Sequence, residues 1–274
     1  MNAGESRRIL IALAPEAPSV AIFEPVFKIA LRNRTPVECI CIEDTRLLDI
    51  AAMPRSQFIH AYSHEPSPLD EAMMRRAMRV ASGRARERFE ATITRTSISW
   101  TFRTQRAALL SEAFSDAAPG DLLVVPLLRG ARNAPQVREL VDAVTGQTAA
   151  SLLVLNEAGA PDRSVLALFD GDCEDLAAAR NLASDFGCPL TVIAVGENSE
   201  TAQALAQQVG VFLEEVGQVA AVRSIVLHGD DALGDAIIEA APGTVVLDRT
   251  GKTVKSIDIV SLLANSSGSL LLRN

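Results

Sequence analysis

The chain has 274 residues, of which 48% are hydrophobic and only 4% aromatic, and its formal net charge is −8. This hydrophobic content excludes a disordered chain, and the length is sufficient for two ordinary domains. A chain this acidic is not expected to bind nucleic acid, and no apolar run is long enough to cross a membrane. The short apolar stretch near the first residue does not fit a secretory signal, so we expect a cytoplasmic protein.

In the first half, short apolar runs alternate with amphipathic segments. Apolar runs without alternation are typical of strands covered on both faces, as in a parallel sheet. We expect such strands at residues 8–13, 37–42, 97–102, 122–125 and 151–155. We expect helices at residues 20–32, 69–93 and 137–144 and in the first part of segment 110–124. Residues 43–67 lack periodicity and predict an excursion with one short helix, and residues 129–135 predict a loop.

The long helix expected at residues 69–93 has two different faces. Its apolar stripe predicts the side that packs against the sheet, and comprises Leu69, Met73, Ala77, Val80, Ala85, Phe89 and Ile93. Its other face is rich in arginine, with Arg75, Arg76, Arg79, Arg84, Arg86 and Arg88. A solvated face paired with acidic neighbours is one interpretation. A docking surface for an acidic partner or a phosphate group is the other.

A polar segment at residues 157–162 separates the halves, and the pattern of strands and helices then begins again. We expect strands at residues 164–169, 190–195, 223–227, 244–247 and 269–272. We expect helices at residues 175–186, 201–216 and 257–264 and in the first part of segment 233–247. Residues 1–156 carry a net charge of +2 and residues 157–274 one of −10, which favours docking of the two halves.

One motif occurs twice, at residues 110–124 and 233–247. Each copy has the pattern of an amphipathic helix, a Pro-Gly stop and an apolar strand. The two copies share Leu110/Leu233, Ala113/Ala236, Ala117/Ala240, Ala118/Ala241, Pro119/Pro242 and Gly120/Gly243. Because alternating strands and helices force right-handed crossovers and a parallel sheet, we expect an α/β protein with two tandem doubly wound domains, residues 1–156 and 163–274.

The cysteines and histidines do not form a recognisable site. Cys39 and Cys41 are two residues apart on an expected strand, so both side chains face the same side of the sheet. This spacing suits core filling better than a metal, and no CxxC pair occurs. His60, His64 and His228 are too scattered for a ligand set. We therefore expect reduced structural cysteines and no metal. No Ser-His-Asp, Cys-His or paired-carboxylate spacing is visible either, so we assign no catalytic residue.

The order of these elements resembles the universal stress protein family, as two tandem copies over nearly the whole chain. The resemblance is carried by residues 166–172 (LALFDGD), by the segments 117–125 and 240–247, and by the terminal strands 151–155 and 269–272. It implies a doubly wound five-stranded parallel sheet in each domain and pairing of the domains through their last strands about a pseudo-two-fold axis. Duplication further predicts two halves that superpose, and not a single continuous sheet.

In nucleotide-binding members, the family implies an Asp at the end of the first strand and a G-x-x-G-x9-G-[ST] loop after the fourth. The first half of this chain departs from both features. Its first strand ends in Ala14-Pro15, only Gly130 fits the later loop, and Pro126 removes a backbone N–H where the first glycine would be. We do not expect this half to bind ATP.

The second half keeps more of the pattern. Asp170-Gly171-Asp172 fits the first-strand site, where a carboxylate can bind ribose or adenine groups, and Gly251 can occupy the second glycine position. Asp248 stands at the first glycine position, where its charge would repel phosphate, although Lys252 and Lys255 could attract an anion. A P-loop is excluded because residue 246 is Val and not Gly. The candidate binding residues are Asp170, Gly171, Asp172, Val195, Gly251 and Lys252. The alternative role for Asp170 is to form a turn or to cap a helix.

Three hypotheses for function follow. The first is a non-catalytic cytoplasmic stress protein with degenerate nucleotide loops and no cofactor, which acts through an unknown protein partner or a small ligand. The second is an ATP-binding stress protein, and conceivably a weak ATPase, that uses Asp170, Gly171, Gly251 and Lys252. The third is a scaffold whose arginine-rich helix binds an acidic partner. The halves should pair within the chain, and a homodimer is also open.

Overall fold

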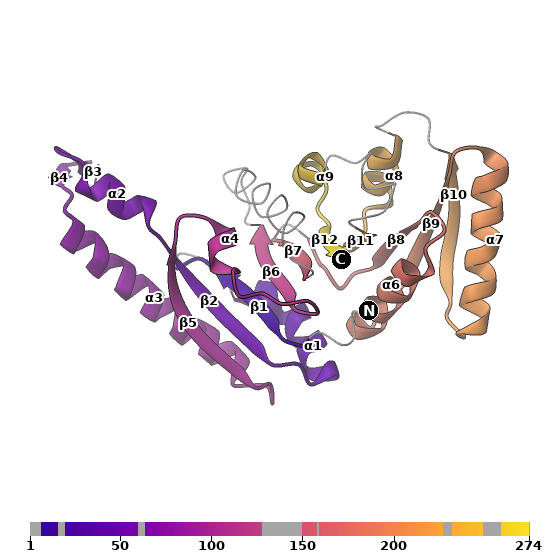
Figure 1. The fold of residues 1–274 in the computed structure, drawn as a ribbon, viewed down its shortest axis with the longest axis horizontal. Helices are drawn as coiled ribbons and strands as arrows, with labels where there is room; N and C mark the ends of the chain where they lie inside the picture. The colour runs from indigo at the N-terminus through magenta and orange to yellow at the C-terminus, as the bar shows by residue number, and fades with distance from the viewer. Residues whose placement is uncertain are drawn as a thin grey trace.

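The computed structural model describes residues 7–15, 20–59, 64–127, 150–157, 159–226, 232–248 and 259–273. In this part of the chain, one large sheet is covered by helices on both faces (Figure 1). Its strands are β1 (Ile9–Leu13), β2 (Val37–Asp44), β5 (Trp100–Ala107), β6 (Leu122–Leu127), β7 (Ser151–Asn156), β8 (Val165–Phe169), β9 (Leu190–Gly196), β10 (Ala220–Val226), β11 (Thr244–Asp248) and β12 (Ser269–Arg273). The helices are α1 (Glu24–Asn33), α2 (Arg46–Ala52), α3 (Glu71–Ile93), α4 (Leu110–Ala113), α6 (Cys173–Phe186), α7 (Ser199–Glu215), α8 (Ala232–Ala240) and α9 (Ile259–Asn265).

The strand order is the same in the two halves, read from each outer edge toward the middle of the sheet. The full order is β10-β9-β8-β11-β12-β7-β6-β1-β2-β5, so each half places its strands as third, second, first, fourth and fifth. Neighbours within a half are parallel, whereas β12 and β7 are antiparallel, with Leu271 opposite Leu153. This mirrored arrangement confirms the expected tandem pair of doubly wound sheets joined through their last strands.

The expectation that duplication would exclude a continuous sheet is wrong. The two five-stranded sheets share hydrogen bonds between β7 and β12 and form one ten-stranded sheet. The reason is that each last strand would otherwise leave a row of unpaired backbone groups at an edge, and antiparallel pairing satisfies both edges together. Duplication and continuity are therefore compatible.

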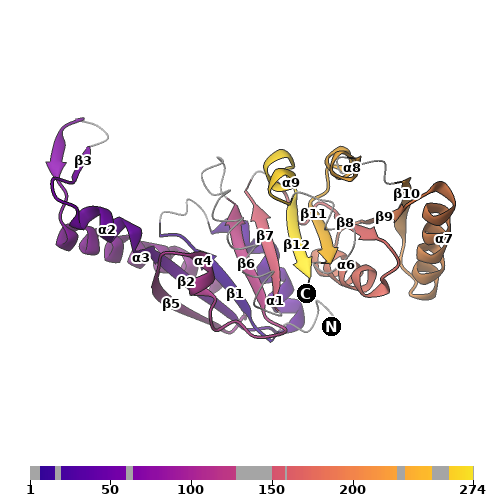
Figure 2. The same cartoon turned by 45° about the horizontal axis from the view of Figure 1, so that its top comes forward.

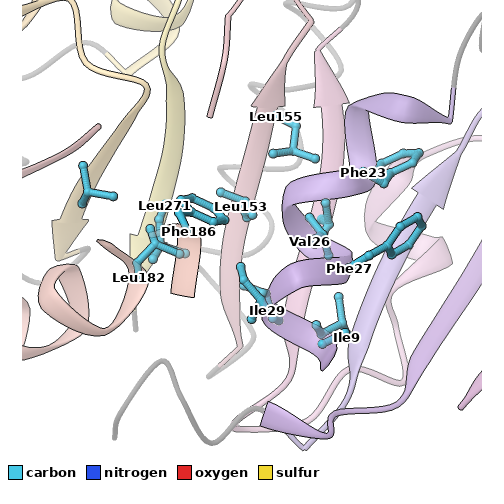
Figure 3. Close-up of a cluster of buried hydrophobic side chains, with 14 of the residues drawn as sticks. Ile9, Phe23, Val26, Phe27, Ile29, Leu153, Leu155, Leu182, Phe186 and Leu271 are labelled. Carbon is cyan, nitrogen blue, oxygen red and sulfur yellow. The ribbon is translucent and has the colours of Figure 1, made fainter. Parts of the chain in front are cut away.

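The core explains why the central strands are apolar throughout. In β1, Ile9, Ile11 and Leu13 face one layer of helices, while Leu10 and Ala12 face the other, and all five are at most 2% exposed. The first layer comprises α1, α3, α6 and α7, and the second comprises α4, α8 and α9. Apolar packing continues across the junction of the halves, where side chains of α1, α6, β7 and β12 lie together (Figure 3).

Polar contacts of α1 with α6 and with the segment before β8 also link the halves. The guanidinium of Arg32 donates to the carbonyl and, at 2.9 Å, to the hydroxyl of Ser184. The side-chain amide of Asn33 donates to Asp185 at 3.2 Å, and Lys28 pairs with Asp162 at 2.6 Å. Burial raises the pKa of Asp185, and Asn33 and Arg32 partly oppose that rise.

The apolar stripe predicted for the long helix is wrong in its first half. The residues of α3 that are buried are Met78, Ser82, Ala85, Phe89 and Ile93, whereas Met73 and Val80 are 41% and 48% exposed. The first turns of α3 extend beyond the sheet and carry α2 and the small hairpin of β3 (Gln57–Ile59) and β4 (Pro66–Pro68) (Figures 1 and 2). These turns have no sheet to pack against, so apolar periodicity there does not mean burial.

Other predicted elements also differ from the structure, among them the strand expected at residues 223–227, which begins at Ala220. The third strand begins at Trp100 and not at residue 97, and the helix of the first repeated motif is only the single turn α4. Arg103 and Arg8 donate to the carbonyls of Ala113 and Asp116, at 3.4 and 2.7 Å, and so take acceptors that a longer helix would use. The second copy forms the full helix α8. The helix predicted at 137–144 and the loop at 129–135 lie outside the described residues.

The cysteine prediction is borne out for the first pair. Cys39 and Cys41 are both buried and reduced, and both face the helix layer of α1 and α3. Burial, with a smaller contribution from Cys41, raises the pKa of Cys39. Within the described residues, no helix is long and apolar enough to cross a bilayer.

Candidate functional site

The second half contains a topological switch point at its centre. The chain runs from β8 outward through β9 to β10, and then returns to place β11 on the other side of β8. In doubly wound sheets, ligands bind outside the carboxyl ends of the strands where the order reverses in this way. The residues that follow β8 and end β11 therefore define the candidate site, and they are Asp170–Asp172 and Asp248.

The segment after β8 is shaped by Gly171 and Asp172. Gly171 has a φ of +118°, a conformation that side chains rarely adopt, so the chain turns sharply between the two aspartates. Asp172 caps α6, because its Oδ1 accepts a hydrogen bond from the N–H of Glu174 at 2.8 Å. The capping role considered for Asp170 thus belongs to Asp172. Asp170 is half-buried at the carboxyl end of β8. The crevice, as we call it, is the ligand position that the topology predicts at the carboxyl ends of β8 and β11.

A buried ion pair lies beneath this segment and was missed in the sequence. Arg273 Nη1 lies 3.2 Å from Asp175 Oδ1, and both residues are 6% exposed. Arg273 Nη2 also donates to Glu174 Oε2 at 3.0 Å. Two sequence signals could have revealed the pair: Asp175 occupies the buried stripe of α6, four residues before Ala179, and Arg273 ends a strand of leucines.

The electrostatics of the crevice are dominated by carboxylates. Burial raises the pKa of Asp175 to about 7, Arg273 opposes the rise, and the charges of Asp248, Asp172 and Asp170 add to it. Together with Glu174, the described residues supply five carboxyl groups and one guanidinium at this end of the sheet. No group of three residues in the described part of the chain is arranged to hold a metal ion.

The structure brings together only some of the predicted residues. Asp170, Gly171 and Asp172 share the crevice, whereas Val195 lies near the end of β9 with its side chain 4% exposed, in the core under α8 and α9. Val195 could therefore meet a ligand only through its backbone. Gly251 and Lys252 lie outside the described residues, so their positions stay predictions.

The corresponding place in the first half is apolar. The register of the last two strands is the same in both halves, with Leu122 opposite Ser151 and Thr244 opposite Ser269. Four residues further along these strands, the first half pairs Pro126 with Leu155. At the same position, the second half pairs Asp248 with Arg273. Leu155 packs in the core near Phe23 (Figure 3). At these corresponding positions, only the second half carries charged residues.

Comparisons with known proteins agree with this architecture. A functionally unknown protein from Pseudomonas aeruginosa has 14% sequence identity and a TM-score of 0.60, over 99% of this chain and 93% of its own. A structure assigned to the universal stress proteins, also from Pseudomonas aeruginosa, has 15% identity and a TM-score of 0.58, over 99% and 94%. A universal stress protein from Archaeoglobus fulgidus has 12% identity and a TM-score of 0.61, over 99% and 97%.

At the level of sequence there is no comparable match. No protein-family model matches the chain, and no curated protein matches it. Proteins with sequence identities this low can share a fold without sharing a function, so these structures define the fold alone. The chain has the tandem fold of universal stress proteins, and the resemblance read from its sequence is confirmed at that level.

Proposed function

We propose that this chain is a non-catalytic universal-stress-type protein that binds a small ligand in the crevice after β8 and β11. The stress-related role rests on its fold, which it shares with universal stress proteins. The observation that carries the ligand class is the set of five carboxylates around Arg273. Such a set of carboxyl groups favours a neutral or cationic ligand over an anionic one.

An ATP-binding function for the second half is the other candidate. It is favoured by one observation, the placement of Asp170 and the left-handed Gly171 at the switch point beside α6. The charges of Asp172 and Asp248 oppose it, because they would repel a polyphosphate at the carboxyl ends of β8 and β11. A cytoplasmic location, a protein partner and a homodimer stay predictions.

Native mass spectrometry of the gently purified protein separates the two functions. We expect the mass of the chain alone or of the chain with a small ligand that carries no polyphosphate. A stoichiometric ATP or ADP adduct that disappears in Asp170→Ala would overturn the proposal in favour of nucleotide binding. Glu214→Ala, an exposed change on the distant helix α7, is the matched control and should leave any adduct unchanged.

A further inference from the structure

A hollow lies at the outer edge of the first half, far from Asp170–Asp172. It opens between α3 and the carboxyl-terminal parts of β2 and β5, and its volume is about 630 Å³. That volume falls within the range of small-molecule sites. The arginine groove, as we call it, is lined by Glu43, Arg79, Ser82, Gly83, Arg86, Phe102, Thr104 and Arg106.

The groove holds more positive charge than its own carboxylate can balance. Arg79 and Arg86 stand seven residues apart and so share one face of α3, while Arg106 comes from β5. Arg106 pairs with Glu43 at 3.3 Å, and Arg86 lies over the ring of Phe102 at 6.0 Å. Among the described residues, no carboxylate pairs with Arg79 or Arg86. Three guanidinium groups therefore face one carboxylate.

The groove exists because a buried side chain separates α3 from the sheet. Glu43 is 4% exposed, and its Oε1 accepts a hydrogen bond from the hydroxyl of Ser82 at 2.9 Å. In the second half, the same place in the register is Gly196, where an added Cβ would lie 2.4 Å from the backbone N of Ala202. The helix α7 thus packs directly on its strand, whereas α3 is held away from β2.

The other charged residues of the groove also lack counterparts in the second half. The register pairs Val37 with Trp100 and Leu190 with Ala220, so Arg106 corresponds to Val226. When α3 and α7 are aligned on their buried residues Phe89 and Val209, Arg79 corresponds to Ser199. In the same alignment, Arg86 corresponds to Ala206. α7 contains no lysine or arginine. Since the same fold forms there without these charges, the fold does not require the arginines.

We infer that the arginine groove binds a small organic anion with at least two negative charges, carried by phosphate or carboxylate groups. Guanidinium groups bind such oxyanions through paired hydrogen bonds of fixed geometry. The hydroxyl of Thr104 adds a donor at the groove wall, and Phe102 offers an apolar contact for the organic part. This site is separate from the crevice of the proposed function and does not depend on it.

Titration calorimetry at low ionic strength tests the inference with pyrophosphate and citrate as probes. We expect both probes to bind the wild-type protein, and the tighter one identifies which oxyanion the groove prefers. The double variant Arg79→Gln/Arg86→Gln should bind at least roughly tenfold more weakly, because it removes two charge-assisted contacts. Arg84→Gln is the matched control: it changes an exposed arginine of the same helix that does not line the groove.

A second variant tests the inference in the opposite direction, because it should increase the affinity for the two probes. Glu43→Gln keeps a hydrogen-bond acceptor for Ser82 and removes the one carboxylate among the described residues that line the groove. We expect this variant to bind the probes several-fold more tightly, with a folded circular-dichroism spectrum. The inference is overturned if the wild type binds neither probe. It is also overturned if Arg84→Gln weakens binding as much as the double variant does, or if only polyglutamate binds, which would indicate an acidic protein partner.

Discussion

Arg273 and Asp175 determine the character of the crevice more than the glycine motif does. Their side chains are buried together beneath Asp170 and Asp172, and the first half has an apolar contact at the corresponding place. A buried pair of this kind is costly to desolvate, and here Asp175 Oδ1 and Arg273 Nε make no hydrogen bond within the described residues.

The raised pKa of Asp175 makes stability depend on pH. The unfolded carboxyl titrates near pH 3.8 and the folded one near 7, so the folded state binds this proton more tightly. The associated stability is therefore complete below about pH 4 and is lost as pH rises toward about 7, with a slope of at most about 1.4 kcal/mol per pH unit. Asp175→Asn should remove this slope.

Urea unfolding of both proteins across that pH range measures the difference. We expect the stability of Asp175→Asn relative to wild type to increase from about pH 4 to 7 and then to level off. A relative stability that stays constant over this interval would show that Asp175 is ionised in the folded protein throughout.

At the scale of elements, most strands and helices follow from periodicity, and the departures have specific causes. The buried strands β1, β8 and β12 were predicted within about one residue, because they lie at the centre of the sheet and are apolar on both faces. β5 was displaced, since this edge strand alternates between exposed and half-buried residues. The hairpin of β3 and β4 was missed because its residues are mostly exposed, so they carry no apolar pattern, and because β4 contains prolines.

The junction of β7 and β12 gives a prediction about cooperativity. Leu271 is 3% exposed and lies opposite Leu153, so Leu271→Ala should lower the free energy of unfolding by about 2–5 kcal/mol. Leu31→Ala, at a 42% exposed position, is the control and should cost less than about 1 kcal/mol. The only tryptophan, Trp100, lies in β5 at the opposite edge of the first half.

This position lets Trp100 fluorescence report on the half that does not contain Leu271. If the continuous sheet unfolds as one unit, the fluorescence midpoint in denaturant should shift by as much as the midpoint from circular dichroism. A shift in circular dichroism with an unchanged Trp100 transition would mean that the halves unfold independently.

For the whole molecule, the two halves form one scaffold with two differently charged edges. The sequence alone was sufficient for the tandem architecture and for Asp170–Asp172, because turn residues after a buried strand are visible in one dimension. It did not reveal the Asp175–Arg273 pair, and of the arginine groove it gave only the arginine face of the long helix, because residues of separate strands and helices meet only in the folded sheet. The acidic crevice lies in the acidic half, and the arginine groove in the other.

Titration calorimetry with adenosine, AMP, ADP and ATP tests the carboxylate-lined crevice most directly. Each added phosphate brings negative charge toward Asp170, Asp172 and Asp248, so any affinity should fall in the order in which the four compounds are named. Because the arginine groove could also take anions, the series is measured in the Arg79→Gln/Arg86→Gln background. We predict no micromolar binding of ATP there. Micromolar ATP binding that strengthens with each phosphate would contradict the account.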